Sequence, residues 1–287
     1  MSILASFMVP TPPIIIPGIG KGAENQIAET TRNYELVADM IAELEPETIV
    51  VASPSATIYT NYFHISPGDF ATGSFAELGA SRIRFIEEYD KKLVAEIEST
   101  AKKRTFPAGT LGERNRDLDF GTMIPLWFIR QKLRKYRIVR VGMSTLPLTD
   151  HYRLGQIINS AVSKLGRKAV FIASGDLSQK LRPDGPFGFS AEGPVYDYKI
   201  MDICSRAAFK ELFGFTEEFL EGASQCCHRQ LVMMAGALDG RDVVAQKLSH
   251  EDVTGVGYGI CSFIPGDINP KRKFLDSFLY ESTVDQN

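Results

Sequence analysis

The fold is decided by one continuous stretch, Lys168-Ala169-Val170-Phe171-Ile172-Ala173-Ser174, which leads directly into Gly175-Asp176-Leu177-Ser178-Gln179. The first part is short and apolar, a pattern typical of a strand that is buried on both faces of a sheet. The glycine and aspartate that follow predict a turn at the end of this strand. We therefore expect a central strand over 168–174 and a loop over 174–180 at its carboxyl end.

The same alternation of buried strands and amphipathic helices extends in both directions from this stretch. Thr48–Ala52 is β-branched and apolar, and it ends at Ser53-Pro54 because proline cannot continue a hydrogen-bonded ladder. Asp90 and Asp150 are expected to cap the N-termini of two helices. Further strands are expected over 3–9, 82–85, 137–143, 243–248 and 258–263, and helices over 34–44, 90–97, 122–133, 150–165, 198–209 and 228–238.

Strands that alternate with helices predict an α/β fold, with a central, mostly parallel or mixed sheet and helices on both of its faces. Binding sites in such folds form where loops leave the carboxyl ends of the strands. Four loops are expected at that position, over 10–20, 53–66, 144–151 and 174–180.

Composition and charge restrict the function classes. Hydrophobic residues make up 44% of the 287 residues, and the net charge of −3 leaves no basic surplus for binding nucleic acid. The N-terminus lacks the basic region of a signal peptide, and no apolar run reaches the roughly 18 residues of a membrane span. The four cysteines match neither a zinc motif nor a disulfide framework, so we expect a reduced, cytoplasmic protein that does not bind membranes.

Five short stretches of small and polar residues each follow an expected strand or begin an expected helix. Loops at such positions carry function more often than the elements that they connect. The five are Val9-Pro10-Thr11-Pro12-Pro13, Ser53-Pro54-Ser55-Ala56, Asp119-Phe120-Gly121-Thr122-Met123-Ile124-Pro125, Ser174-Gly175-Asp176-Leu177-Ser178-Gln179 and Gln225-Cys226-Cys227-His228-Arg229.

Together, these stretches resemble the LigB-like class III extradiol ring-cleavage dioxygenase superfamily, and most closely the LigB-like domain of AmmeMemoRadiSam proteins, which is related to Memo. The resemblance implies a LigB-like, phosphorylase-like three-layer sandwich over 1–270. It also implies a C-terminal tail over 271–287, where a short helix over 272–281 is expected. Other stretches that contribute are Tyr62-Phe63-His64-Ile65-Ser66-Pro67-Gly68, Pro107-Ala108-Gly109-Thr110-Leu111-Gly112-Glu113-Arg114, Asp150-His151-Tyr152-Arg153-Leu154-Gly155 and Gly255-Val256-Gly257-Tyr258-Gly259.

The chain departs from the pattern that the resemblance implies. The first four stretches would carry Pro-His-Pro-Pro, Ser-Pro-His-Ala, Asp-His-Gly-Thr-Met and Ser-Gly-Asp-Leu-Ser-His, and the fifth Glu-Cys-Gly. The first two histidines and a later acidic residue, or a cysteine in the Memo branch, would hold Fe(II), and the fourth histidine would be the acid/base catalyst. This chain has Thr11, Ser55, Phe120, Gln179 and Gln225 at the corresponding positions.

These residue types do not supply the chemistry of ring cleavage. Ferrous iron in such enzymes is bound by two imidazoles and a carboxylate, and a neutral hydroxyl or amide is a poor substitute. Gln179 cannot titrate near neutral pH, as a proton shuttle must. We therefore expect no iron and no other cofactor at this position. Phe120 is expected to fill part of the pocket, which Thr11, Ser55, His64, Phe120 and Gln225 would offer to a small molecule.

Other residues leave alternatives open. Cys226, His228 and His64 could form a softer metal site, suited to zinc or copper. His64 and His151 could instead be hydrogen-bonded walls of the pocket, and Cys226 a buried small hydrophobe. Asp176 could cap its turn or orient a donor in the pocket.

Three functions follow from these readings. The first is a non-catalytic paralogue that serves as a partner subunit or binds a small molecule, either as a homodimer or beside an intact LigB-like chain. The second is a metal-independent hydrolase or isomerase that uses Gln179, Asp176 and His151, with Cys226 as a further candidate. The third is a metal-dependent dioxygenase or other oxidoreductase with rearranged ligands, acting on a small aromatic or polar substrate.

Overall fold

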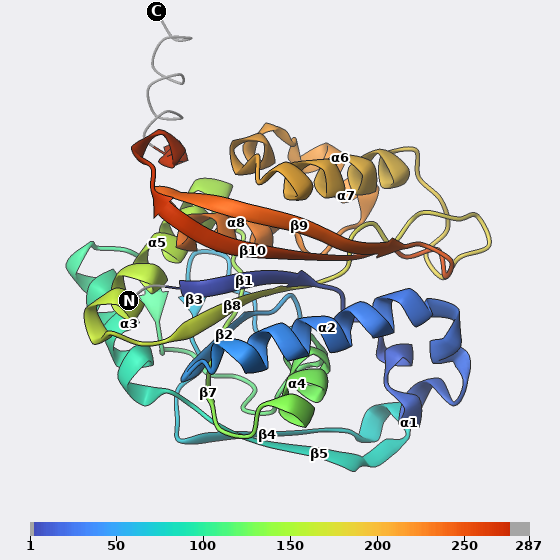
Figure 1. Cartoon of the computed structure of the whole chain (residues 1–287), viewed down its shortest axis with the longest axis horizontal. Coiled ribbons are helices and arrows are strands. Elements are labelled where there is room, and N and C mark those ends of the chain that lie inside the picture. The colour runs from blue at the N-terminus through green and yellow to red at the C-terminus, as the bar shows by residue number, and fades with distance from the viewer. Residues whose placement is uncertain (1–2, 276–287) are drawn as a thin grey trace, which may run out of the picture.

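The computed structural model describes residues 3–275 and shows a sheet with helices packed on both faces (Figure 1). Within these residues the main sheet has six strands in the order β7-β2-β8-β1-β10-β9. The strands are β1 (Ile3–Val9), β2 (Thr48–Ala52), β7 (Arg137–Val141), β8 (Ala169–Ser174), β9 (Arg241–Glu251) and β10 (Tyr258–Ile268). β8 lies near the centre, as its apolar sequence predicts.

The sheet is mixed, and its parallel part contains the strands that end at the candidate loops. β8 pairs in parallel with both β1 and β2, and β2 pairs in parallel with β7. β10 is antiparallel to β1, and β9 is antiparallel to β10. The prediction of an α/β fold with a mostly parallel or mixed sheet is therefore confirmed.

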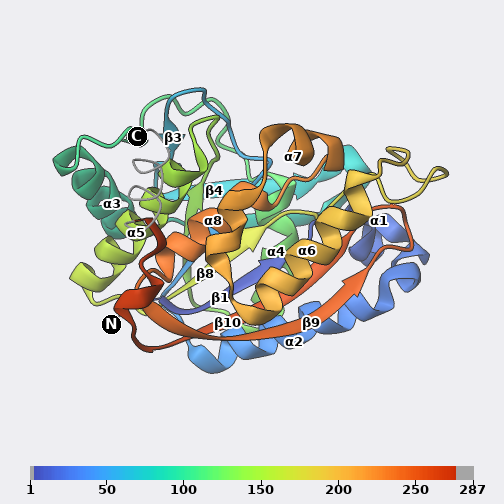
Figure 2. The same cartoon turned by 90° about the horizontal axis from the view of Figure 1, so that it is seen from above.

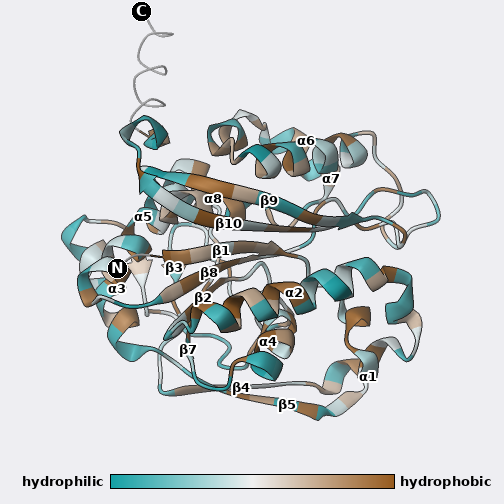
Figure 3. Ribbon diagram, in the orientation of Figure 1, coloured by the Kyte–Doolittle hydropathy of each residue, from teal (hydrophilic) through white to brown (hydrophobic). Residues whose placement is uncertain are grey.

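Each face of the sheet has its own apolar core, because side chains alternate between the two faces along a strand. In β2, Val50 and Ala52 pack into one core and Ile49 and Val51 into the other. Figure 3 shows the apolar colour concentrated along the strands in the middle of the molecule. Burial on both faces explains why these strands are continuous apolar runs rather than alternating ones.

The helices form the outer layers. α2 (Ala28–Leu44) and α4 (Phe120–Lys132) cover one face of the sheet. The other face carries α3 (Lys91–Lys103), α5 (Leu148–Leu165), α6 (Glu192–Arg206) and α8 (His228–Ala237). Seen from above, α6 runs along β9 and β10, with α7 (Glu217–Ala223) beyond it (Figure 2). The layers are those of a three-layer sandwich.

Shorter elements complete the described chain. Residues 82–85 form a strand as expected, but within β5, which pairs with β4 in a two-stranded sheet apart from the main one. These elements are α1 (Pro17–Gly20), β3 (Phe63–His64), β4 (Phe70–Phe75), β5 (Ala80–Glu88), β6 (Ala108–Gly109) and 3-10 turns at Pro13–Ile15, Ala23–Ile27, Ala76–Leu78, Phe209–Gly214 and Pro270–Arg272. Most of the helix expected over 272–281 lies outside the described residues.

Two predicted helix starts had different outcomes. Asp90 caps α3 and accepts a hydrogen bond from the Leu93 amide at 3.1 Å, as predicted. The prediction for Asp150 was wrong, since α5 begins at Leu148 and its N-cap is Pro147. Asp150 lies in the first helical turn, where a carboxylate interacts favourably with the helix dipole without capping it. Within the described residues, no helix has the length and apolar character to cross a membrane.

Candidate functional site

Three of the predicted site residues follow strands that have their carboxyl ends on the same side of the main sheet. β1, β8 and β2 are parallel neighbours that end at Val9, Ser174 and Ala52. Thr11 and Ser55 therefore lie in the loops that follow the two strands beside β8, and each of these strands lies about 4.8 Å from β8. We call this region, formed by the loops that carry Thr11, Ser55 and Asp176, the β8 edge.

Asp176 is bonded to the first loop of the β8 edge. Its Oδ1 accepts a hydrogen bond from the Thr11 amide at 2.6 Å and a longer one from the Thr11 hydroxyl at 3.4 Å. Burial raises the pKa of Asp176 to about 6, and the hydrogen bonds from Thr11 oppose this rise. A carboxyl group with such a pKa can exchange protons near neutral pH.

The Gly175-Asp176 turn also packs tightly against Cys226. The Asp176 amide lies 3.1 Å from Cys226 Sγ, and the Cys226 amide donates to the Asp176 carbonyl at 3.2 Å. Gly175 has a φ of 149°, and a Cβ there would lie 2.7 Å from the Cys226 carbonyl oxygen. Only glycine fits this approach. Burial raises the pKa of the Cys226 thiol well above its usual value, so the sulfur stays protonated.

The two glutamines have roles in the backbone structure. The Gln225 side chain accepts a hydrogen bond from the His228 amide at 2.9 Å, and this contact holds the N-terminal turn of α8. The main-chain N–H of Gln179 donates a hydrogen bond to the Ser224 carbonyl at 3.3 Å. Ser178 and Gln225 form an isolated antiparallel bridge, so the turn after β8 and the segment before α8 lie side by side.

On the other side of β8, the loop after β2 meets the start of α4. The Ser53 hydroxyl donates to Asp119, the N-cap of α4, and the Ser174 hydroxyl donates to the Gly121 carbonyl at 2.5 Å. Ser55 and Phe120 line an open cavity of about 770 Å³ together with Asp119.

Phe120 stacks on Phe75, with ring centroids 6.0 Å apart, and thus belongs to the cavity wall. The cavity is open despite the phenyl ring.

The histidines of the chain make their contacts away from Thr11, Ser55 and Asp176. His64 Nδ1 lies 3.0 Å from the Leu111 carbonyl, and its Nε2 lies 3.2 Å from a Glu113 carboxylate oxygen without an aligned hydrogen bond. His151 Nδ1 lies 3.1 Å from the Pro147 carbonyl, and burial lowers the pKa of His151 to about 4.

His228 is equally engaged. Its Nε2 lies 2.9 Å from the Leu212 carbonyl and its Nδ1 lies 3.3 Å from the Tyr196 hydroxyl. Burial lowers the pKa of His228 to about 4, so the ring is neutral at neutral pH. Across residues 3–275, no three His, Cys, Asp or Glu side chains cluster closely enough to hold a metal ion. The structure thus does not bring Cys226, His228 and His64 together.

Sequence reasoning missed one buried charge beside the site, Arg140 of β7. Its side chain is 4% exposed and donates to the Ser66 hydroxyl at 2.7 Å and to the Asn115 and Asp117 carbonyls at 2.9 and 2.5 Å. It also lies 3.6 Å from Asp119. Arg140 thereby fastens the loop before α4 to the sheet. The available signal was an arginine inside an apolar strand, which is rarely buried without partners.

The amino-acid sequence of this chain is similar to those of known proteins. A family described as the catalytic LigB subunit of aromatic ring-opening dioxygenase matches residues 6–261. Protein CA_C1420 of Clostridium acetobutylicum is 32% identical over 267 residues, which cover 91% of this chain and 57% of that protein. This chain therefore spans little more than half the length of that relative.

Two further comparisons are more distant. The 2-aminophenol 1,6-dioxygenase beta subunit of a Pseudomonas species is 22% identical over 287 residues, covering 90% of this chain and 92% of that subunit. The crystal structure of the uncharacterized protein JW3007 from Escherichia coli K12 superposes with a TM-score of 0.54 at 15% identity, covering 90% of this chain and 99% of that one. At this identity the structural match supports the fold alone.

Proposed function

This chain belongs to the LigB family of aromatic ring-opening dioxygenase subunits, and on that premise we propose that it is a non-catalytic member of the family. It would act as a partner subunit or a small-molecule-binding protein, with hydroxyl and amide groups where related chains hold Fe(II). One observation carries this proposal: no imidazole is hydrogen-bonded to Thr11, Ser55 or Asp176, since the ring nitrogens of the four histidines contact other groups.

The donors that remain at the β8 edge do not suit ferrous iron. Thr11 and Ser55 offer neutral hydroxyls. The side-chain oxygen of Gln225 already accepts a hydrogen bond from the main-chain N–H of His228. The Cys226 thiol is protonated and packs on the Asp176 backbone. Asp176 is a single carboxylate, whereas the usual ferrous site needs two imidazoles beside it. We therefore derive no catalytic step through iron.

The cavity next to Ser55 supports binding of a small molecule. Its volume of about 770 Å³ lies within the usual range for ligand sites. Asp119 and Arg84 provide charged groups on its wall, and Phe120 and Phe85 provide aromatic surface. This combination suits a small aromatic or polar compound.

A partner subunit is supported by the name of one relative and by one exposed surface. The Pseudomonas relative is a beta subunit, so that protein works beside another chain. In this chain, Phe70 of β4 and Ile86 of β5 are 62% and 75% exposed, and the strand register places them on one face of the hairpin. Such apolar exposure favours a protein contact. We expect this chain to pair with a second copy or with an intact LigB-like subunit.

The test is to restore the residues that the family pattern implies. A quadruple variant with Thr11→His, Ser55→His, Gln179→His and Gln225→Glu should bind one ferrous ion under anaerobic conditions and open catechol rings in oxygen. The wild-type chain should do neither, and a control with only Gln179→His should match the wild type. Ring opening by the unaltered chain would refute the proposal.

A second function is favoured by Asp176 alone. Its pKa of about 6 and its contacts with Thr11 and Cys226 suit metal-independent acid–base catalysis in a hydrolase or isomerase. Compounds that bind the folded chain are first found because they raise its melting temperature. If the wild type and Gln179→Ala convert one of these compounds and Asp176→Asn does not, this function is favoured over the first.

A further inference from the structure

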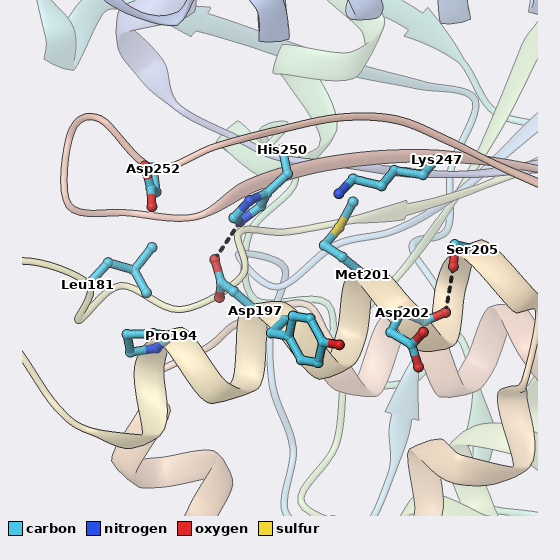
Figure 4. Close-up of a pocket in the computed structure, with 10 residues that line it drawn as sticks. Leu181, Pro194, Asp197, Met201, Asp202, Ser205, Lys247, His250 and Asp252 are labelled. Carbon is cyan, nitrogen blue, oxygen red and sulfur yellow. Dashed lines mark hydrogen bonds and ion pairs between the residues drawn. The ribbon is translucent and has the colours of Figure 1, made fainter.

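A second pocket lies on the opposite side of β10 from β1, between α6 and β9 (Figure 4). Its volume is about 400 Å³, enough for a small metabolite. We call it the α6–β9 pocket. Its charged and polar lining consists of Asp197, Tyr198, Asp202, Ser205, Lys247, His250 and Asp252. None of these residues belongs to the β8 edge.

A β-bulge aims two basic side chains of β9 into this pocket. Ser249 pairs with Ile260 and Lys247 pairs with Cys261, so Leu248 is an extra residue without a partner on β10. In a regular strand, Lys247 and His250 would point to opposite faces because their separation is odd. The bulge shifts the alternation and places both on the face that packs against α6.

Asp197 of α6 fixes the orientation of His250. The Asp197 side chain is buried, and its Oδ2 lies 2.8 Å from His250 Nε2. Its Oδ1 accepts a hydrogen bond from the Ser178 amide at 2.8 Å. A Cβ at position 257 would collide with Asp197 Oδ2, so Gly257 provides the space that this carboxylate occupies.

These contacts leave one His250 nitrogen as a hydrogen-bond acceptor for a ligand. With Nε2–H directed at Asp197, Nδ1 has no partner among residues 3–275. Burial raises the pKa of Asp197, and the hydrogen bond from His250 opposes the rise. The pair resembles the carboxylate–histidine arrangements in which the carboxylate sets the position of the ring.

The other charges divide the pocket into two ends. The described residues place no carboxylate within ion-pair distance of Lys247, whereas Asp202 is paired with Arg206 at 2.5 Å. Figure 4 shows Lys247 and Asp252 on opposite sides of His250. The pocket therefore has a basic end at Lys247 and an acidic end at Asp252, with His250 between them.

We propose that the α6–β9 pocket binds a small aminocarboxylate, with its carboxylate at Lys247 and its ammonium group at Asp252, where the ammonium can also donate a hydrogen bond to His250 Nδ1. The pocket matches one charge at each end, and Met201, Leu181 and Pro194 line it with apolar surface suited to the carbon chain. Because Asp197 also holds the Ser178 amide, the ligand would be sensed by the turn that follows β8.

The test is calorimetric titration with a defined series: glycine, 4-aminobutyrate and 6-aminohexanoate, with butyrate and butylamine as single-charge controls. At least one aminocarboxylate should bind about tenfold or more tightly than either single-charge control, the scale of one charge-assisted contact. Lys247→Gln and His250→Gln should each weaken that binding about tenfold or more. Asp252→Asn should lower it to the level of butyrate and leave butyrate unchanged.

One control variant and one spectroscopic measurement complete the test. Lys92→Gln removes an exposed lysine from α3 and should leave binding unchanged. In nitrogen-15 spectra, the bound aminocarboxylate should shift the Ser178 amide resonance. The proposal is overturned if none of the three aminocarboxylates binds, if Lys247→Gln binds as the wild type does, or if the bound probe shifts the Thr11 amide and not that of Ser178.

Discussion

The β8 edge and the α6–β9 pocket use polar residues in opposite ways. At the β8 edge, Thr11, Gln225 and Cys226 contact backbone or carboxylate groups and hold the loops together. In the α6–β9 pocket, His250 has a free nitrogen and Lys247 has no ionic partner among the described residues. Membership of a family therefore predicts the fold, whereas the charged groups that are available to a ligand have to be identified residue by residue.

The largest effect is expected for the buried arginine that supports the β8 edge. Arg140→Ala should lower the free energy of unfolding by about 3–5 kcal/mol, because Asp119 and Glu113 then lose a nearby buried charge. Chemical denaturation measures the change. Arg137→Ala, on the same strand but in an exposed pair with Glu88, should cost less than about 1 kcal/mol. Equal losses would show that the Arg140 contacts do not stabilise the loop.

A smaller loss is expected in the α6–β9 pocket. Gly257→Ala should lower the free energy of unfolding by about 1–3 kcal/mol, since the new methyl group displaces Asp197 from its site. Gly266→Ala is the matched control on β10, where a Cβ would have ordinary contacts at 3.5 Å or more. Thermal unfolding of both variants measures this difference. If Gly257→Ala is as stable as the wild type, Asp197 does not occupy the space beside position 257.

In contrast to the two changes above, a substitution of Asp176 should increase the free energy of unfolding at neutral pH. Its folded-state pKa of about 6 exceeds the ordinary value, so the folded chain loses stability as pH rises from about 4 to 6. Asp176→Asn removes this ionisation and should be more stable than the wild type by about 1–2 kcal/mol at pH 7.5. The advantage should vanish below about pH 4. Urea unfolding at several pH values measures it, and a wild type that gains stability over this range would contradict the assignment.

The smallest effect is expected at Lys247. Because its side chain is exposed and has no ionic partner among residues 3–275, Lys247→Gln should change the free energy of unfolding by less than about 0.5 kcal/mol. The same substitution should weaken aminocarboxylate binding, so the residue separates ligand binding from stability. A large loss of stability would instead give Lys247 a structural role.

The sequence was sufficient for the sheet and for much of the helical layer. Thr48–Ala52 is a strand at its predicted bounds, because a buried parallel strand is a continuous apolar run. Asp90 caps α3 as predicted, since a cap depends on neighbours only a few residues away. Asp150 shows the limit of such reasoning: Pro147 starts α5 one turn earlier than the acidic residue suggested.

The site was less predictable, because it depends on contacts between distant segments. Motif order placed Thr11 and Asp176 near each other, and the strand order explains why they meet. The α6–β9 pocket was not foreseen. Its His250–Asp197 pair joins residues 53 positions apart, and the bulge at Leu248 leaves no sequence signal in a strand that reads as regular. Roles for Gln179, His151 and the other site residues stay predictions.

Anaerobic equilibrium dialysis of the unaltered chain against ferrous iron tests the central claim most directly. We expect less than stoichiometric, weakly held iron that a mild chelator removes, because the loops at Thr11, Ser55 and Asp176 present hydroxyls and one carboxylate instead of imidazoles. One tightly bound ferrous ion per chain, lost on Thr11→Ala or Ser55→Ala, would contradict the account.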